Sequence, residues 1–190
     1  AREDSTGSLW FTQSTENQNE ERLFSALGKA IPDGALYRLS FNEDGTLSKP
    51  ELILENLYFA NGFYIDEKRK KFYLSEMMSN RVLVFDFDLA TGSLSNQATL
   101  AIIPTPDNME MNNDGNLDIF FSGNQVDNAL YLGDGHFNFE DVSQLAGITS
   151  PNSWSTGVSV LDINEDGLLD IYVCKSGRPN DLNRRNELFI

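Results

Sequence analysis

The 190-residue chain is poor in the residues that most often carry enzyme chemistry and covalent cross-links. It has one cysteine, Cys174, so no disulfide can form within the chain, and Cys174 is expected to fill space in a strand as a small hydrophobe. Its one histidine, His136, stands in a glycine-rich turn and gives no support for a Ser-His-Asp triad. No phosphate-binding glycine loop and no Cys-His metal cluster is present either.

Basic residues are also scarce, with 14 Lys and Arg against 29 Asp and Glu, for a net charge of −15. Proteins that bind nucleic acid gain most of their affinity by neutralising phosphates with Lys and Arg, so this composition excludes a nucleic-acid partner and disfavours anionic membrane surfaces. No apolar run approaches the ~20 residues that span a bilayer, so we predict no membrane insertion.

The chain is rich in short apolar runs, and many of them contain some of its 13 Phe and 6 Tyr residues. Five Asp-Gly pairs, beginning at residues 33, 44, 114, 134 and 166, punctuate these runs as hairpin turns do. The pattern predicts an all-β, antiparallel fold with at most two short helices, near 19–30 and 142–146, and a β-sandwich is the competing arrangement. The expected strands are 8–12, 35–41, 51–54, 57–65, 71–75, 81–87, 98–103, 117–121, 129–132, 157–161 and 169–174.

The loop Asp162-Ile-Asn-Glu-Asp-Gly-Leu-Leu-Asp170 carries the most specific signal. A hard cation such as Ca²⁺ takes six to eight oxygen ligands, and spaced carboxylates and amides on a tight loop supply them. The predicted ligands are the side chains of Asp162, Asn164, Asp166 and Asp170 with the backbone carbonyl of Leu168. The loop is not an EF-hand, because a β-rich run follows it directly, and a plain polar hairpin turn is the alternative.

An imperfect copy of this loop lies 162 − 110 = 52 residues earlier. It offers Glu110, Asn112, Asp114 and Asp118, with a Glu where the later loop has Asp162, so it is the weaker predicted Ca²⁺ site or only a turn. A repeat of this length, built from short strands and turns, is the size of one β-propeller blade. At about 45–50 residues per blade, the chain makes about four antiparallel blades, an incomplete or hybrid propeller.

Residues 110–190 resemble the VCBS/FG-GAP repeats of the ASPIC type, which are calcium-loop propeller blades. The resemblance rests on the following motifs in this order: Asn-Asp-Gly-Asn-Leu-Asp118, Asn128-Ala-Leu-Tyr-Leu-Gly-Asp-Gly135, Phe139-Glu-Asp-Val-Ser-Gln-Leu-Ala-Gly147 and Trp154-Ser-Thr-Gly-Val158, leading into the 162–170 loop.

Residues 1–109 resemble a second family, the strictosidine-synthase and gluconolactonase (senescence-marker-protein) superfamily. The resemblance is carried by segments 7–12, 34–39, 57–62, 71–76, 80–86 and 106–108. It implies a propeller with an axial Ca²⁺, and lactone or ester hydrolysis in several members. It also implies that Asn61 and Asp107 are metal ligands, with Asn108 beside them. The spacing 107 − 61 = 46 is close to one blade.

The same resemblance implies an upstream Asn ligand and an upstream Glu ligand, for which this sequence has no counterpart. We therefore expect a fragment, or a fusion of two propeller types joined near 109–116, with little hydrolase activity of its own. Two functions stay open: a calcium-dependent lactone or ester hydrolase, and a calcium-stabilised module that binds a protein or glycan. In either case we expect an extracellular or periplasmic location.

Overall fold

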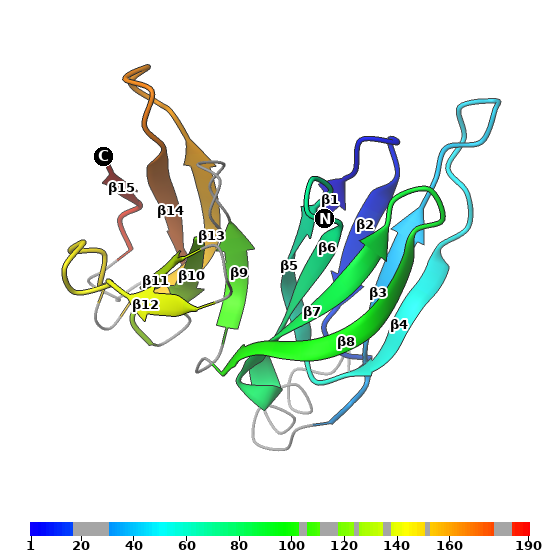
Figure 1. Ribbon diagram of the computed structural model, residues 1–190, viewed down its shortest axis with the longest axis horizontal. Coiled ribbons are helices and arrows are strands. Elements are labelled where there is room, and N and C mark those ends of the chain that lie inside the picture. Colours follow the sequence, from blue (N-terminus) through cyan, green and yellow to red (C-terminus); the bar gives the residue numbers. More distant parts are fainter. Residues whose placement is uncertain are drawn as a thin grey trace. The chain divides into compact units, whose positions relative to one another are not determined.

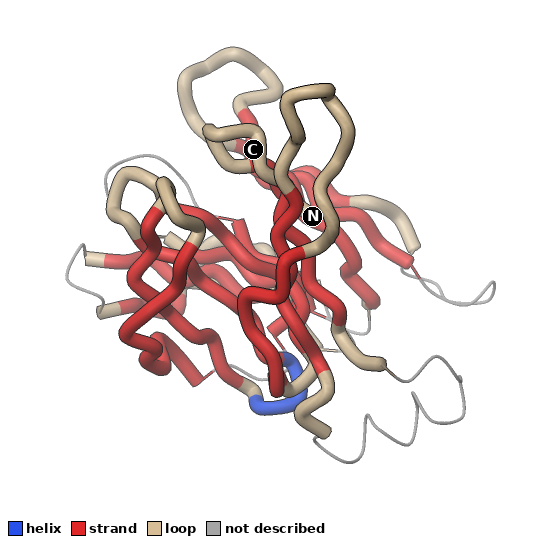
Figure 2. The backbone as a smooth tube through the Cα atoms, turned by 90° about the vertical axis from the view of Figure 1, so that its right-hand side faces the viewer, coloured by secondary structure: helices blue, strands red, loops and turns tan. Residues whose placement is uncertain are grey.

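The computed structural model describes residues 1–16, 31–102, 106–110, 118–123, 126–134, 138–150, 153–176 and 184–190. The chain divides into two compact units, Ala1–Ile103 and Pro104–Ile190, and each unit is described by itself. Strands dominate the described residues, whose one helical element is the 3-10 helix η1 (Met77–Ser79) (Figure 2). Among these residues no helix is long and apolar enough to cross a bilayer.

The first unit holds two four-stranded antiparallel sheets, and in each the neighbouring strands follow one another along the chain (Figure 1). The first sheet consists of β1 (Arg2–Glu3), β2 (Leu9–Gln13), β3 (Gly34–Leu39) and β4 (Glu51–Leu57). The second consists of β5 (Ala60–Asp66), β6 (Lys71–Glu76), β7 (Arg81–Asp88) and β8 (Ser93–Ile102). The last strands, β4 and β8, are largely exposed, so the core lies against the earlier strands of each sheet.

An aromatic cluster joins these two sheets. Phe72 lies in its centre, with its ring 5.3 Å from Trp10 and stacked at 5.3 Å on Phe63. Because side chains alternate along a strand, residues at every second position of β7, including Phe85 and Phe87, enter the same core. Burial of these large side chains supplies the main driving force for packing the two sheets.

The second unit repeats the scheme. Its four-stranded sheet contains β9 (Pro106–Glu110), β10 (Ile119–Gly123), β11 (Ala129–Gly133) and β12 (Phe139–Asp141), in chain order. Its three-stranded sheet contains β13 (Trp154–Leu161), β14 (Asp170–Ser176) and β15 (Glu187–Phe189). Among the described residues, a core of this unit is centred on Phe120, Ile148 and Val173.

The prediction of an all-β, propeller-type fold is confirmed. The four sheets found in the described residues are antiparallel meanders of three or four consecutive strands, which is the topology of a propeller blade and not the Greek key of a sandwich.

Several strand ends were predicted wrongly. The expected strand 57–65 is two elements, because β4 ends at Leu57 and β5 begins at Ala60, with Phe59 between them at a positive φ of 57°. The helix expected at 142–146 is a hydrogen-bonded turn closed by Gly147, in which Ala146 N donates to Val142 O at 2.8 Å. The helix expected at 19–30 lies outside the described residues.

Candidate functional site

The predicted ligand Asn61 lies in a break of the β5–β6 pairing. Ala60 pairs with Glu76 and Phe63 with Leu74, so two residues of β5, Asn61 and Gly62, stand opposite one residue of β6. Such a β-bulge bends its strand and re-aims the side chains at the break. The direction of the Asn61 side chain therefore need not follow the regular alternation of side chains along the rest of β5.

The predicted ligand Asp107 lies in the same kind of break in the other unit. Pro106 pairs with Gly123 and Met109 with Phe121, so Asp107 and Asn108 stand opposite one residue of β10. Asn61 and Asp107 are each the second residue of the first strand of their sheet. The bulge therefore gives the two predicted ligands equivalent places in two blades.

Each bulge faces a buried serine that the sequence did not single out. Ser75 of β6 and Ser122 of β10 are fully buried, and among the described residues their hydroxyls have no hydrogen-bond partner. A buried polar group without a partner is uncommon and marks a place for a functional or solvent contact. In the sequence, these two serines are marked only by their place directly after similar apolar runs, Phe-Tyr-Leu-Ser75 and Ile-Phe-Phe-Ser122.

The amide of Asn61 is held from one side. Its Nδ2 contacts Met77 Sδ at 3.8 Å, and its backbone carbonyl accepts a hydrogen bond from Thr12 Oγ1 at 2.8 Å. Among the described residues nothing donates a hydrogen bond to Asn61 Oδ1. A half-buried amide oxygen with a free lone pair is a ligand of the kind that Ca²⁺ prefers, so this residue fits a cation site.

The backbone just before Asn61 is strained and braced. Phe59 has a φ of 57°, a region that costs a bulky residue about 1–3 kcal/mol. Its carbonyl accepts a hydrogen bond from Met77 N at 3.2 Å, and Tyr58 N donates to the buried Glu76 Oε1 at 2.9 Å. Arg81 Nε in turn donates to Glu76 Oε2 at 2.5 Å. The start of β5 is thus tied to the end of β6.

The 162–170 loop closes on its own carboxylates. Asp162 accepts hydrogen bonds from Asp166 N at 3.1 Å and Gly167 N at 2.9 Å. Asp166 Oδ1 accepts from Leu168 N at 2.8 Å. Gly167 has a φ of 87°, a conformation that glycine adopts without a Cβ penalty.

The other two predicted side-chain ligands of this loop, Asn164 and Asp170, also accept hydrogen bonds from backbone N–H groups within it. Asn164 Oδ1 accepts from Asp166 N at 3.0 Å, and the buried Asp170 accepts from Ile163 N at 2.9 Å. Each oxygen keeps lone-pair capacity for a cation. No group of three or more His, Cys, Asp or Glu side chains that could hold a metal ion occurs in the described part of the chain. Ca²⁺ at this loop stays a prediction.

The first loop is described only in part. Asn112 and Asp114 lie outside the described residues, and Glu110 is placed as the last residue of β9. Asp118 is buried, and its Oδ1 accepts a hydrogen bond from Gly133 N at 2.9 Å, which ties the start of β10 to the end of β11. The weaker ion site also stays a prediction.

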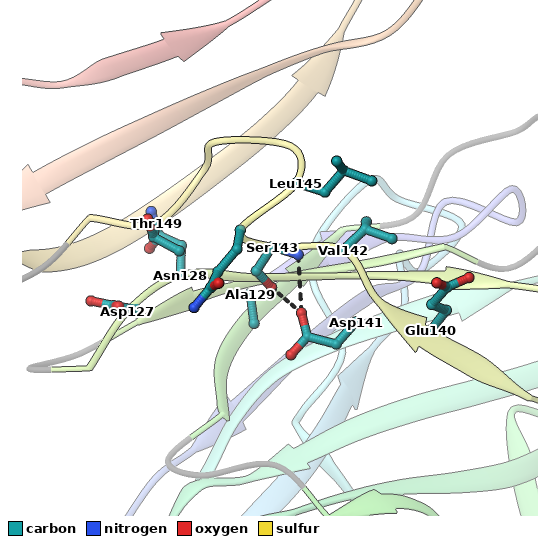
Figure 3. Close-up of a pocket in the computed structure, with 10 residues that line it drawn as sticks. Asp127, Asn128, Ala129, Glu140, Asp141, Val142, Ser143, Leu145 and Thr149 are labelled. Carbon is teal, nitrogen blue, oxygen red and sulfur yellow. Dashed lines mark hydrogen bonds between the residues drawn. The ribbon is translucent and has the colours of Figure 1, made fainter.

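The second unit has an open depression of about 790 Å³ that contains none of the predicted ligands (Figure 3). Asp141 Oδ1 accepts hydrogen bonds from Ser143 N at 3.0 Å and Ser143 Oγ at 2.5 Å, and these bonds lower the pKa of Asp141. The other two carboxylates at its lining, Asp127 and Glu140, are spread apart in Figure 3 and do not converge with Asp141. We therefore assign no cation to this depression.

Sequence profiles of two families match the chain. The SMP-30/Gluconolactonase/LRE-like region matches residues 1–128, which is more than half of the sequence. The chain belongs to this family. An FG-GAP-like repeat matches residues 111–173, so the two matches overlap around the first predicted loop site. Both resemblances predicted from the sequence are confirmed.

Known relatives share the fold at low identity. A luciferin-regenerating enzyme superposes with a TM-score of 0.63 at 20% identity over 98% of this chain and 58% of its own. A gluconolactonase from Xanthomonas campestris superposes with a TM-score of 0.60 at 15% identity, over 92% of this chain and 52% of its own. Regucalcin from Agrobacterium tumefaciens, a calcium-binding protein, superposes with a TM-score of 0.61 at 14% identity, over 95% of this chain and 53% of its own.

A curated relative, Cell growth-regulated gene 1 protein of Candida albicans, is 26% identical over 95 residues. The alignment covers 45% of this chain and 28% of that protein. The chain thus spans between a quarter and three-fifths of the relatives it matches.

Proposed function

We propose that the chain forms part of a calcium-dependent propeller hydrolase that acts on lactones or esters, with Asn61 and Asp107 as ligands of the ion and Asn108 as their neighbour. The observation that carries the proposal is the shared bulge, which gives Asn61 and Asp107 the same place in two blades. Membership of the gluconolactonase-like family over residues 1–128 supports the substrate class.

The chemistry of the proposed ligands suits a hard cation. Asn61 offers a neutral amide oxygen and Asp107 a carboxylate, and both are oxygen types that Ca²⁺ binds in proteins. A bound Ca²⁺ supplies Lewis acidity toward an ester or lactone carbonyl. The part of the protein is to hold the ligand oxygens in place, because a misplacement of about 1 Å costs about a hundredfold in rate.

The 162–170 loop is proposed as a second, structural Ca²⁺ site, with a weaker one at Glu110, Asn112, Asp114 and Asp118. Backbone N–H bonds already order the carboxylates of this loop, and an ion there would require the side chains of Asp162, Asp166 and Asp170 to turn toward one another. Such an ion stabilises the β13–β14 hairpin and takes no part in hydrolysis.

Calcium titration of the purified chain tests this assignment. Besides the weaker site of the first loop, we expect two classes of site by calorimetry: one lost in Asn61→Ala and Asp107→Ala, the other lost in Asp166→Ala. Asp44→Ala is the matched control, because Asp44 lies in an Asp-Gly turn where no ligand is predicted and accepts a hydrogen bond from Thr46 N at 2.9 Å. If Asn61→Ala and Asp107→Ala both left every Ca²⁺ affinity unchanged, the axial site would be wrong.

Hydrolysis of a lactone panel in Ca²⁺ and in chelator tests the activity. We expect turnover close to background, because the identified axial ligands number two or three and Ca²⁺ takes six to eight oxygens. Calcium-dependent turnover well above background that Asn61→Ala abolished would show instead that the axial site is complete. Turnover that persists in chelator would contradict the proposed chemistry.

The second candidate is a calcium-stabilised interaction module. The FG-GAP-like match over residues 111–173 and the ordered 162–170 loop favour it. A Ca²⁺ response that depends on Asp166 alone, with no hydrolysis of any lactone or ester, would select this function and point to a protein or glycan partner.

A further inference from the structure

The contact between Asn61 and Met77 decides which way the amide faces. A thioether sulfur accepts hydrogen bonds and cannot donate them, so the group that contacts Met77 Sδ at 3.8 Å is the amide nitrogen of Asn61. The amide oxygen then points away from Met77. Met77 is 7% exposed and begins the η1 turn, so its sulfur is a fixed acceptor.

The same turn fixes the backbone that carries Asn61. Met77 N donates to Phe59 O and Met78 N to Tyr58 O, both at 3.2 Å. These bonds hold Phe59 in its left-handed conformation, two residues before Asn61. A strained residue of this kind persists only where its surroundings over-determine it, and such residues gather at functional sites.

Glu76 completes the brace. It is 1% exposed, and it accepts hydrogen bonds from Tyr58 N at 2.9 Å and from Arg81 Nε at 2.5 Å. Charge-assisted bonds of this kind are stronger than neutral ones. Glu76 therefore ties the Leu57–Tyr58 peptide to the end of β6, while Met77 orients the side chain of Asn61.

We propose that Glu76 and Met77 are positioning residues that present Asn61 Oδ1 to a divalent cation, Glu76 by holding the bend at Phe59 and Met77 by orienting the amide. This inference rests on the proposed function in naming the cation. The contacts that carry it all lie within the unit Ala1–Ile103.

The sequence supplies its own matched pair for the test, Met77→Leu and Met78→Leu. Leucine keeps the volume of methionine but has no acceptor, so only the first substitution removes the Asn61 contact. Calcium binding is measured by calorimetry in an Asp166→Ala background, which removes the loop site. We expect Met77→Leu to raise the Kd for Ca²⁺ roughly two- to tenfold, the cost of freezing one freed side chain on binding. We expect Met78→Leu to leave the Kd unchanged.

A second readout is independent of the ion. In the ¹H–¹⁵N spectrum of the metal-free chain, the side-chain amide of Asn61 is assigned by its loss in Asn61→Ala. We expect Met77→Leu to shift and broaden this signal, and Met78→Leu to leave it in place. For Glu76, we expect Glu76→Gln, which keeps an oxygen for Tyr58 N, to retain the Kd that Glu76→Ala loses.

The outcomes separate the inference from the function on which it rests. If Asn61→Ala weakens Ca²⁺ binding but Met77→Leu and Met78→Leu behave alike in both experiments, the positioning role is overturned and the ion site stands. If Asn61→Ala leaves Ca²⁺ binding unchanged, the proposed ion site is overturned, and the positioning of Asn61 for a cation falls with it. A chain in which Met77→Leu alone moves both readouts supports the proposal.

Discussion

The indole nitrogen of Trp10 donates a hydrogen bond to Asp4 Oδ2 across 2.8 Å, between two side chains that are almost wholly buried. Burial by itself raises the pKa of Asp4, and hydrogen bonds from Thr6, Trp10 and Ser8 outweigh it, so the pKa lies below its usual value. The aromatic core of the first unit is therefore anchored by a carboxylate that favours its ionised form.

The stability that Asp4 contributes should depend on pH. Because its folded pKa is lowered, this contribution is fully present above the unfolded pKa of about 3.9 and is lost as the pH falls through the folded pKa. We expect Asp4→Asn to lower the free energy of unfolding by about 1–3 kcal/mol at neutral pH and the difference to shrink in acid. Denaturant unfolding across that range measures it. A constant difference at every pH would contradict the role of the charge.

For the buried serine opposite the Asp107 bulge, we expect that removing the hydroxyl does not lower the stability of the fold. The Ser122 hydroxyl has no partner among the described residues, so Ser122→Ala should be neutral or stabilising by up to about 1 kcal/mol. Ser143→Ala in the same unit is the matched comparison, because its hydroxyl accepts from Leu130 N at 2.9 Å and donates to Asp141. It should lose about 1–3 kcal/mol.

Thermal unfolding of both serine variants, without added metal, compares them. A loss in Ser122→Ala as large as that in Ser143→Ala would mean that the Ser122 hydroxyl is bonded in solution, to water or to a ligand at the Asp107 bulge.

Much of this fold could be predicted from the sequence, because the spacing of apolar runs and the turns between them are local properties of the chain. Short apolar runs between Asp-Gly turns predicted antiparallel meanders, and a 52-residue repeat predicted blades. The polar start of β8 was missed because this outer strand is exposed and carries no apolar pattern there. The break at Phe59 was missed because Leu57-Tyr-Phe-Ala60 reads as one continuous apolar run.

The candidate site was predictable only through its family motifs. Asn61 and Asp107 were identified by resemblance, and their shared bulge depends on pairing with β6 and β10, which a linear sequence does not show. Met77 and Glu76 were missed for the same reason. They read as the end of an apolar strand, while their contacts to Asn61 and Tyr58 arise from the way the chain folds back.

Glu76 should be among the residues of the first unit most sensitive to truncation. Glu76→Ala leaves Tyr58 N without an acceptor and Arg81 without its counter-ion, and the Arg81 side chain is 31% exposed, which limits the cost. We expect a loss of about 2–3 kcal/mol in the free energy of unfolding, against about 1 kcal/mol for Glu76→Gln. Urea unfolding of the two variants measures the difference. Equal losses would show that the hydrogen bond to Tyr58 contributes little.

The last prediction concerns calcium and the 162–170 loop. A ligand that binds only the folded state stabilises it by RT ln(1 + [L]/Kd), which is about 2.7 kcal/mol at a free concentration a hundred times the Kd. We expect Ca²⁺ to raise the melting temperature of the chain, Asp166→Ala to remove most of that rise, and Asp44→Ala to retain it. Asp166 and Asp44 each accept hydrogen bonds from the backbone two residues on, so a difference between them reports the ion and not the turn. If Ca²⁺ and chelator gave the wild-type chain the same melting temperature, the loop would be a hairpin turn and nothing more.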